Sequence, residues 1–311
     1  MSGGLHTRKV NSSKIPFNEI VSEILGAPVG NFSVSRFCDD AEGELRQYNV
    51  YKVELNGRVY VLKNSSKEEV FVYEKLLNGK NLPVPEFFGK AVRGGKTWIL
   101  IEYIEGADLR DFTDGAARAA AESITAVMKT YWQNSAEEFE SKRVDDRFAR
   151  YWERVNKRAQ CLKNESLLSA AYKVFLERQQ SCPRTLSNGD FLQYNAIFQG
   201  GKVFIIDWAF AGIMPYSLDI ARLIAHGTPD RATFPFFMTY GHKKTYVEEV
   251  YKNLPVQIEF KRYEQDIKLS LLNEYIEFIE YYLNNPEEER PQFFNYYYEH
   301  ALKLTDEILG Q

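Results

Sequence analysis

The amino-acid sequence predicts an α+β protein with two lobes: an antiparallel β-sheet lobe with one inserted helix, and a larger, mostly α-helical lobe after it. Two observations support this prediction. Short segments of alternating apolar residues, joined by glycine-containing turns, fill residues 32–104. After Gly106, nearly every segment spaces its apolar residues as a helix does. We therefore expect an N-terminal lobe at residues 1–104 and a C-terminal lobe at residues 105–311.

The N-terminal lobe is predicted to begin with a polar leader, residues 1–14, which is loose and lacks the apolar stretch of a secretory signal. A helical pattern then ends at Gly26. The Asn56-Gly57 pair predicts a hairpin, because both positions of a type I′ turn need a positive φ. The predicted elements are helices at 15–25 and 65–77, the latter capped by Ser66, and strands at 32–38, 48–55, 58–63, 87–92 and 96–104.

The C-terminal lobe is predicted to be helical except for a short β-rich segment at residues 185–207. Apolar residues recur at helical spacing on both sides of this segment. The predicted helices cover residues 116–132, 145–162, 166–179, 217–225, 245–252, 258–283 and 292–309.

Composition and charge exclude several classes of protein. The formal net charge is −4 and there is no long basic run, which argues against a nucleic-acid partner. No apolar run approaches the roughly 18 residues of a membrane span, so we expect no membrane association. The cysteines Cys38, Cys161 and Cys182 lie far apart, which favours reduced thiols and a cytoplasmic location. The sequence does not indicate an oligomeric state.

The β-rich segment carries three residues suited to phosphoryl transfer. Asp190 can accept the proton of an attacking hydroxyl, and is the candidate catalytic residue. Asn195, five residues later, and Asp207, at the end of an apolar strand, are candidate Mg²⁺ ligands. Protein kinases place Asp and Asn at the same spacing. Asp and Asn beside glycine often only form turns, but the strand ending at Asp207 makes that alternative less favourable.

A lysine in the N-terminal lobe is the candidate anchor for nucleotide phosphates. Lys63 ends the third predicted strand, and a helix that carries acidic residues follows it. Such a lysine requires a helix glutamate as its partner. We take Glu69 as that partner and keep Glu74 as the alternative.

Two further segments are expected to contact the nucleotide. The turn at residues 39–44 contains Gly43, whose backbone N–H could approach a phosphate, although the turn is acidic. Glu102, Tyr103 and Ile104 end the N-terminal lobe and are expected to form a hinge whose backbone binds adenine. The alternative for the turn at residues 39–44 is an ordinary acidic hairpin. The alternative for Glu102, Tyr103 and Ile104 is simply the end of a strand.

These motifs resemble the aminoglycoside phosphotransferase and choline kinase superfamily, whose members share the protein-kinase-like fold. The resemblance covers residues 32–225. It rests on Asn188-Gly189-Asp190 with Asn195, on Asp207-Trp208 followed by Gly212, on Asp219-Ile220-Ala221, and on Pro83-Val84-Pro85. The resemblance implies ATP or GTP as phosphate donor and Mg²⁺ as cofactor. It also implies that Asp219 braces the catalytic loop.

One residue departs from the family pattern: Asn188 stands where the family usually has histidine. Asparagine can also hydrogen-bond neighbouring backbone, so activity remains compatible with this change. A protein kinase is less favoured, because the chain between Asp207 and Asp219 leaves no room for a long activation loop.

The expected reaction moves the γ-phosphate of ATP to a hydroxyl of a small molecule, with an amino alcohol or amino sugar favoured. Aromatic and acidic residues occur together in the last two helices, and such residues can hold a cationic acceptor. Their helical spacing favours a place in the core for most of them, and a neutral sugar is a further alternative. The competing function is a degenerate kinase fold that binds nucleotide or a partner without catalysis. The residues concerned are Glu274, Glu277, Glu280, Tyr281, Tyr282, Phe293, Phe294, Tyr296, Tyr297, Tyr298 and Glu299.

Overall fold

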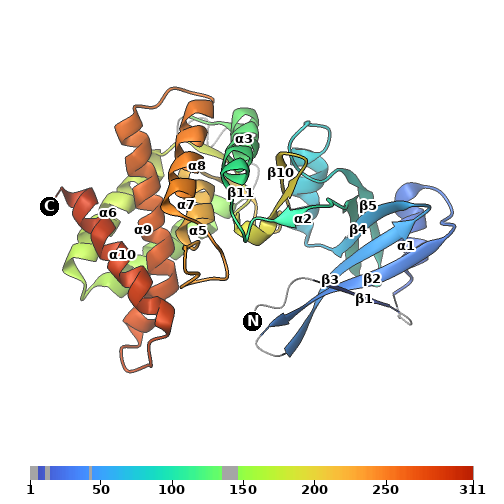
Figure 1. The fold of residues 1–311 in the computed structure, drawn as a ribbon, viewed down its shortest axis with the longest axis horizontal. Coiled ribbons are helices and arrows are strands. Elements are labelled where there is room, and N and C mark those ends of the chain that lie inside the picture. The colour runs from blue at the N-terminus through green and yellow to red at the C-terminus, as the bar shows by residue number, and fades with distance from the viewer. Residues whose placement is uncertain (1–5, 11–14, 42–43, 135–145, 311) are drawn as a thin grey trace. The chain divides into compact units, whose positions relative to one another are not determined.

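The chain folds into two compact units, Met1–Gly106 and Ala107–Gln311, which divide it two residues after the predicted boundary. The first unit contains an antiparallel sheet and the second is mostly helical (Figure 1), which confirms the predicted α+β fold class. The structure is a computed structural model, and it describes residues 6–10, 15–41, 44–134 and 146–310.

The N-terminal unit contains a six-stranded antiparallel sheet in the order β1-β2-β3-β4-β6-β5. Between β3 and β4, Asn56 and Gly57 have φ angles of 50° and 80°, and Leu55 pairs with Arg58, so the predicted two-residue hairpin is confirmed. The strands are β1 (His6–Lys9), β2 (Phe32–Ala41), β3 (Glu44–Leu55), β4 (Arg58–Asn64), β5 (Phe87–Arg93) and β6 (Lys96–Glu102).

The first strand corrects the prediction of a loose leader for part of residues 1–14, of which residues 1–5 and 11–14 lie outside the described residues. Residues 6–9 form β1, which pairs with β2 from His6–Cys38 to Lys9–Ser35. Only an edge pairing defines this strand, and most of its side chains are exposed. A strand without a buried face has no apolar alternation, so sequence periodicity could not reveal it.

Helix α1 (Phe17–Leu25) packs on the sheet beside β5 and β6. Its buried face carries Phe17, Ile20 and Val21. The Phe17 ring lies 4.7 Å from that of Tyr51 and 6.4 Å from that of Trp98, both in the sheet. This aromatic contact forms the centre of the N-terminal core.

The inserted helix begins as predicted. Ser66 caps α2 (Lys67–Phe71) by accepting the Glu69 N–H at 3.1 Å. Beyond Phe71 the chain continues as a π-helical segment, η1 (Val72–Leu77). Capping thus fixes the backbone of Glu69, the candidate partner of Lys63.

The C-terminal unit is built around long helices. Helices α9 and α10 pack against each other and, with α5 and α6, contribute to one cluster of buried apolar residues in this unit (Figure 1). The helices are α3 (Asp114–Tyr131), α5 (Arg147–Ala159), α6 (Ser166–Ser181), α7 (Ser217–Ala225), α8 (Tyr240–Asn253), α9 (Phe260–Asn284) and α10 (Gln292–Leu309), with the short helical turns η2 (Gln160–Leu162) and η3 (Gln193–Asn195).

Short strands position the predicted catalytic segment. The loop at residues 188–195, which we call the catalytic loop, connects β8 to β9, and Asp207 follows β10. Strands β9 and β10 form a hairpin joined by β7, while β8 pairs with β11. The strands are β7 (Ala107–Asp108), β8 (Arg184–Ser187), β9 (Ala196–Gln199), β10 (Lys202–Ile205) and β11 (Gly212–Pro215).

A buried carboxylate on α7 holds the start of the catalytic loop. Asp219 Oδ1 accepts from the Ser187 hydroxyl at 2.7 Å and from the Gly189 N–H at 3.2 Å, and Oδ2 accepts from the Asn188 N–H at 2.7 Å. Burial raises the pKa of Asp219 to about 6, against the opposing effect of these hydrogen bonds. Asp219 is therefore the brace that the family resemblance implied.

Gly189 is required in this loop for two reasons. Its φ is +78°, a conformation that residues with a Cβ rarely adopt. A Cβ at this position would also lie 2.2 Å from the Phe210 carbonyl oxygen. The backbone of the catalytic loop can therefore lie this close to Phe210 only if residue 189 is a glycine.

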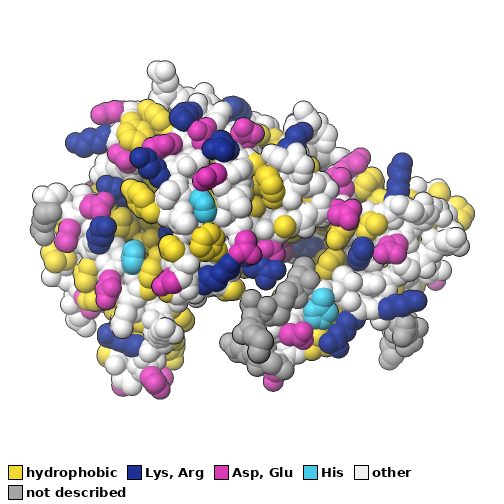
Figure 2. Space-filling model, viewed as in Figure 1, with side chains coloured by type: hydrophobic (Ala, Val, Ile, Leu, Met, Phe, Trp, Pro, Cys, Tyr) yellow, Lys and Arg dark blue, Asp and Glu magenta, His cyan; other side chains and the backbone are white. Residues whose placement is uncertain are grey.

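Charged side chains of both signs are interspersed over the face drawn in Figure 2. None of the helices among the described residues is both long and apolar enough to span a bilayer.

We predict that Gly189→Ala destabilises the protein more than Gly201→Ala does. Gly201, in the turn of the β9–β10 hairpin, has a similar φ of +81°, but a Cβ there would meet no atom within 4 Å. Gly201→Ala should cost about 1–2 kcal/mol for the left-handed backbone. Gly189→Ala should cost about 1–3 kcal/mol more for the clash. Urea unfolding measures both free energies, and equal losses would contradict the close approach to Phe210.

Candidate active site

Asn188, the departure from the family pattern, ties the catalytic loop to the strand that ends at Asp207. Its side-chain Nδ2 donates to the carbonyl oxygens of Ile206 at 3.2 Å and Asp207 at 3.0 Å. Its Oδ1 accepts the Asp190 N–H at 3.2 Å. The side chain is completely buried. Asparagine therefore makes the backbone hydrogen bonds that the sequence suggested it could make.

Asp190 is held through both of its carboxylate oxygens. Arg222 Nη2 donates to Oδ1 at 2.8 Å, and Asn195 Nδ2 donates to Oδ2 at 3.1 Å. The side chain retains 19% of its exposure. Burial raises the pKa of Asp190 above its ordinary value, and Asp207 adds to this effect while Arg222 opposes it. A fixed, partly exposed carboxylate is suited to accept a proton from a bound hydroxyl.

Asn195 and Asp207 lie on two hydrogen-bonded segments. The Ile206 N–H donates to the Asn195 carbonyl at 2.9 Å. The Asn195 amide nitrogen binds both the backbone and the side chain of Asp190, so its oxygen is the atom that can bind a cation. Asp207 has a left-handed backbone, with φ of +55°. One amide oxygen and one carboxylate fit Mg²⁺, which takes few protein ligands together with substrate phosphates.

In the N-terminal unit, Lys63 forms an ion pair with Glu69, as expected, at 2.7 Å between Nζ and Oε1. Glu69 is buried, with 1% of its surface exposed. The alternative partner, Glu74, instead binds Lys90 at 2.6 Å. The pairing of Lys63 is therefore resolved in favour of Glu69.

The structure describes only some of the other residues that we predict to contact the nucleotide. Strand β6 ends at Glu102, whose N–H binds the Glu86 carbonyl at 2.8 Å. Tyr103 and Ile104 follow outside any strand, so their backbone groups take no part in the sheet ladder. Gly43 lies outside the described residues.

The sequence interpretation missed Arg222, which contacts the candidate base directly. Arg222 lies on α7 three residues after Asp219, so one face of this helix presents both residues to the catalytic loop. That spacing was the available signal. Arg222 Nη1 also donates to Glu274 on α9 at 2.8 Å, a pairing across 52 residues that no local pattern indicates.

The proposed cation-binding residues of α9 and α10 are largely used within the fold. Glu274 binds Arg222, and both Glu277 and Glu280 bind the buried Arg158 at 2.9 and 2.6 Å. Phe294 and Tyr297 are buried core residues. These contacts give the cation-binding hypothesis no support from this segment.

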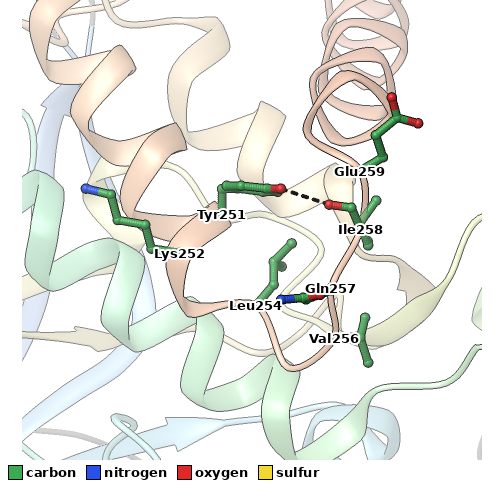
Figure 3. Close-up of a pocket in the computed structure, with 7 residues that line it drawn as sticks. All are labelled: Tyr251, Lys252, Leu254, Val256, Gln257, Ile258 and Glu259. Carbon is green, nitrogen blue, oxygen red and sulfur yellow. Dashed lines mark hydrogen bonds between the residues drawn. The ribbon is translucent and has the colours of Figure 1, made fainter.

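A surface hollow between α8 and α9 is separate from these residues (Figure 3). Leu254 and Gln257 line it, and the Tyr251 hydroxyl donates to the Ile258 carbonyl at 2.9 Å. No residue of the catalytic loop contributes to its lining.

Solved structures of small-molecule kinases share this fold. An aminoglycoside phosphotransferase from Alicyclobacillus acidocaldarius matches with a TM-score of 0.57 at 13% identity, covering 97% of each chain. A spectinomycin phosphotransferase in complex with ADP and spectinomycin matches with a TM-score of 0.54 at 11% identity, covering 96% of this chain and 98% of that one. Choline kinase from Cryptosporidium parvum matches with a TM-score of 0.51 at 11% identity, covering 99% and 90%. These likenesses show a protein-kinase-like fold.

A search among curated protein sequences found no match. The family model described as "Phosphotransferase enzyme family" matches residues 43–246, more than half of the 311-residue chain. This range includes Lys63, the catalytic loop, Asp207 and Asp219. The chain therefore belongs to the phosphotransferase enzyme family, as the sequence predicted.

Proposed function

We propose that this kinase transfers the γ-phosphate of ATP to a hydroxyl group of an amino alcohol or amino sugar. The observation that carries the proposal is the fixed position of Asp190. Its carboxylate is held by Arg222 and Asn195, while Asn188 links its loop to the backbone of Asp207. A base and two oxygen ligands thereby share one rigid framework.

In the proposed reaction, Asp190 orients the acceptor hydroxyl and takes its proton. The hydroxyl oxygen forms a bond to the γ-phosphorus while the bond from that phosphorus to the β,γ-bridging oxygen breaks, releasing ADP. Asp190 then holds the proton until solvent or product removes it. The amide oxygen of Asn195 and the carboxylate of Asp207 would hold Mg²⁺, which neutralises charge on the phosphates.

The N-terminal unit would supply the nucleotide contacts. Lys63, oriented by its ion pair with Glu69, is proposed to bind the α- and β-phosphates. The backbone of Glu102, Tyr103 and Ile104 is proposed to bind the base, and Gly43 to approach the phosphates. ATP as donor is supported by two similar structures, one described with ADP and another with AMP-PNP. GTP is the alternative donor.

The acceptor class rests on the similar structures rather than on contacts in this chain. Their descriptions name spectinomycin and hygromycin B as bound molecules, and ethanolamine kinase and choline kinase as proteins. These share a hydroxyl-bearing acceptor, which is the feature the proposed reaction requires.

A cytoplasmic location is part of the proposal, and the thiols of Cys38, Cys161 and Cys182, which form no disulfide, agree with it.

The competing function, a nucleotide-binding protein without catalysis, is favoured by the acidic turn at residues 39–44 and by Asn188. Its hydrogen bonds now account for that residue without loss of the loop geometry. The phosphotransferase reading is therefore the better supported of the two.

We predict that the wild-type protein, given Mg-ATP, phosphorylates at least one compound in a panel of amino alcohols, amino sugars and neutral sugars. The measurement is transfer of label from [γ-³²P]ATP to the acceptor, with EDTA as control. Labelled inorganic phosphate alone, with no labelled acceptor, would contradict the amino alcohol and amino sugar assignment. Transfer only to neutral sugars would also overturn that assignment, while preserving the kinase.

We predict that Asp207→Ala abolishes Mg²⁺-dependent ATP binding, whereas Asp190→Ala retains it. Asp207 would bind the metal on the phosphates, but Asp190 faces the acceptor hydroxyl. Thermal unfolding reports the difference, because a ligand at a hundred times its Kd stabilises a protein by about 2.7 kcal/mol. Equal loss of the nucleotide-induced shift in both variants would show that the two roles are wrongly assigned.

We predict that Glu69→Gln weakens Mg-ATP binding by about tenfold, because Lys63 loses its charged partner. Glu74→Gln is the matched control, since Glu74 lies on η1, which continues directly from α2, and binds the sheet residue Lys90. It should leave the Kd within about twofold, as expected for an exposed ion pair. Calorimetric titration measures the Kd of Mg-ATP for both variants. An equal increase of the Kd in both would contradict a specific role of the Lys63–Glu69 pair in nucleotide binding.

A further inference from the structure

The guanidinium of Arg222 joins the catalytic loop to the interior of the C-terminal unit. It donates from Nη2 to Asp190 Oδ1 and from Nη1 to Glu274 Oε2, both at 2.8 Å. A guanidinium is planar, and its N–H groups point in fixed directions. Two carboxylates on the two Nη atoms therefore fix its orientation, and with it the position of Asp190 Oδ1.

Glu274 is a stable partner for this arginine. Its side chain on α9 is only 8% exposed, and its Oε2 lies 3.5 Å from Nε2 of the buried His226. His226 Nδ1 in turn lies 2.8 Å from the Tyr297 hydroxyl. Burial alone would raise the pKa of Glu274, but Arg222 and His226 lower it to about 2, so the carboxylate stays ionised.

We propose that Arg222 is a positioning residue for the catalytic base, and that Glu274 holds Arg222 in place for this task. The inference rests on the proposed role of Asp190. Arg222 binds one oxygen of that carboxylate, and Asn195 binds the other. Each oxygen has a second lone pair, so the base can still accept a proton.

Restraint of both oxygens prevents rotation of the Asp190 carboxylate. The lone pair that receives the proton then points in the same direction in every turnover, which is the condition for efficient transfer from an oriented hydroxyl. Among the donors in the described part of the chain, loss of Arg222 would leave Asp190 with the Asn195 amide alone, and the carboxylate could turn away from the acceptor.

A purely structural role is the alternative, and Arg158 provides the comparison. Arg158 is also a buried arginine, and it binds Asn273, Glu277 and Glu280 of the same helix α9. Those partners lie on α9 rather than in the catalytic loop. Arg158→Met should therefore reduce stability without changing kcat.

The test is a double-mutant cycle on kcat with an acceptor identified in the panel. Arg222→Met should lower kcat by about 10-fold to 10²-fold, with KM for Mg-ATP within about twofold of wild type. Combined with Asp190→Asn, it should lower kcat by less than about twofold further, because the group that it positions is already disabled.

In Arg222→Met, the carboxylate of Glu274 loses its arginine partner, and the protein could misfold for that reason alone. A second variant controls for this effect. Arg222→Met together with Glu274→Leu removes both charges, a replacement that buried ion pairs often tolerate. It should reproduce the loss of kcat seen with Arg222→Met alone.

Two results would overturn the inference. If Asp190→Asn is slow while both Arg222 variants turn over at the wild-type rate, Asp190 remains the proposed base but Arg222 does not position it. If the losses of Arg222→Met and Asp190→Asn multiply in the double variant, Arg222 acts independently of Asp190. A wild-type rate in Asp190→Asn itself would instead show that Asp190 is not the catalytic base, and Arg222 would then have no base to position.

Discussion

The arrangement of the candidate catalytic residues depends on the buried carboxylate of Asp219. It accepts hydrogen bonds from Ser187, Asn188 and Gly189, and so fixes the backbone just before Asp190. One of these donors is the backbone N–H of the buried Asn188, and leaving a buried N–H without a partner is costly. Because Asn188 then binds the carbonyls of Ile206 and Asp207, the same constraint extends to the strand that carries the candidate metal ligand.

A set of arginine–carboxylate pairs connects this framework to the helices of the C-terminal unit. Arg222 links α7 to α9, Arg158 links α5 to α9, and Arg178 on α6 binds the buried Asp266 of α9 through two hydrogen bonds. Helix α9 thus supplies a carboxylate to each of three other helices. Buried charges are tolerated only when paired in this way; Asp266 and Glu274 are the buried carboxylates of this set, whereas Glu277 and Glu280 are 40% and 36% exposed.

The sequence predicted the local features of this protein well. The Asn56-Gly57 turn, the Ser66 cap and the choice of Glu69 for Lys63 each depend on residues close together in the chain or on a known geometric requirement. It could not predict β1, which only a pairing with β2 defines, or the pair of Arg222 with Glu274, which joins separate helices. The arginine partners of the α9 acids also lie far away in sequence, so no local pattern indicates these ion pairs.

The central claim is that Asp190 is the catalytic base of a phosphotransferase, and single-turnover kinetics test it most directly. The rate of γ-phosphate transfer from saturating Mg-ATP to a bound acceptor is measured for the wild type and for Asp190→Asn, which keeps the size of the side chain but loses its basicity. We expect the variant to bind nucleotide normally and to react about 10²-fold or more slowly, the usual scale for a lost general base. Equal rates in the two proteins would contradict the claim.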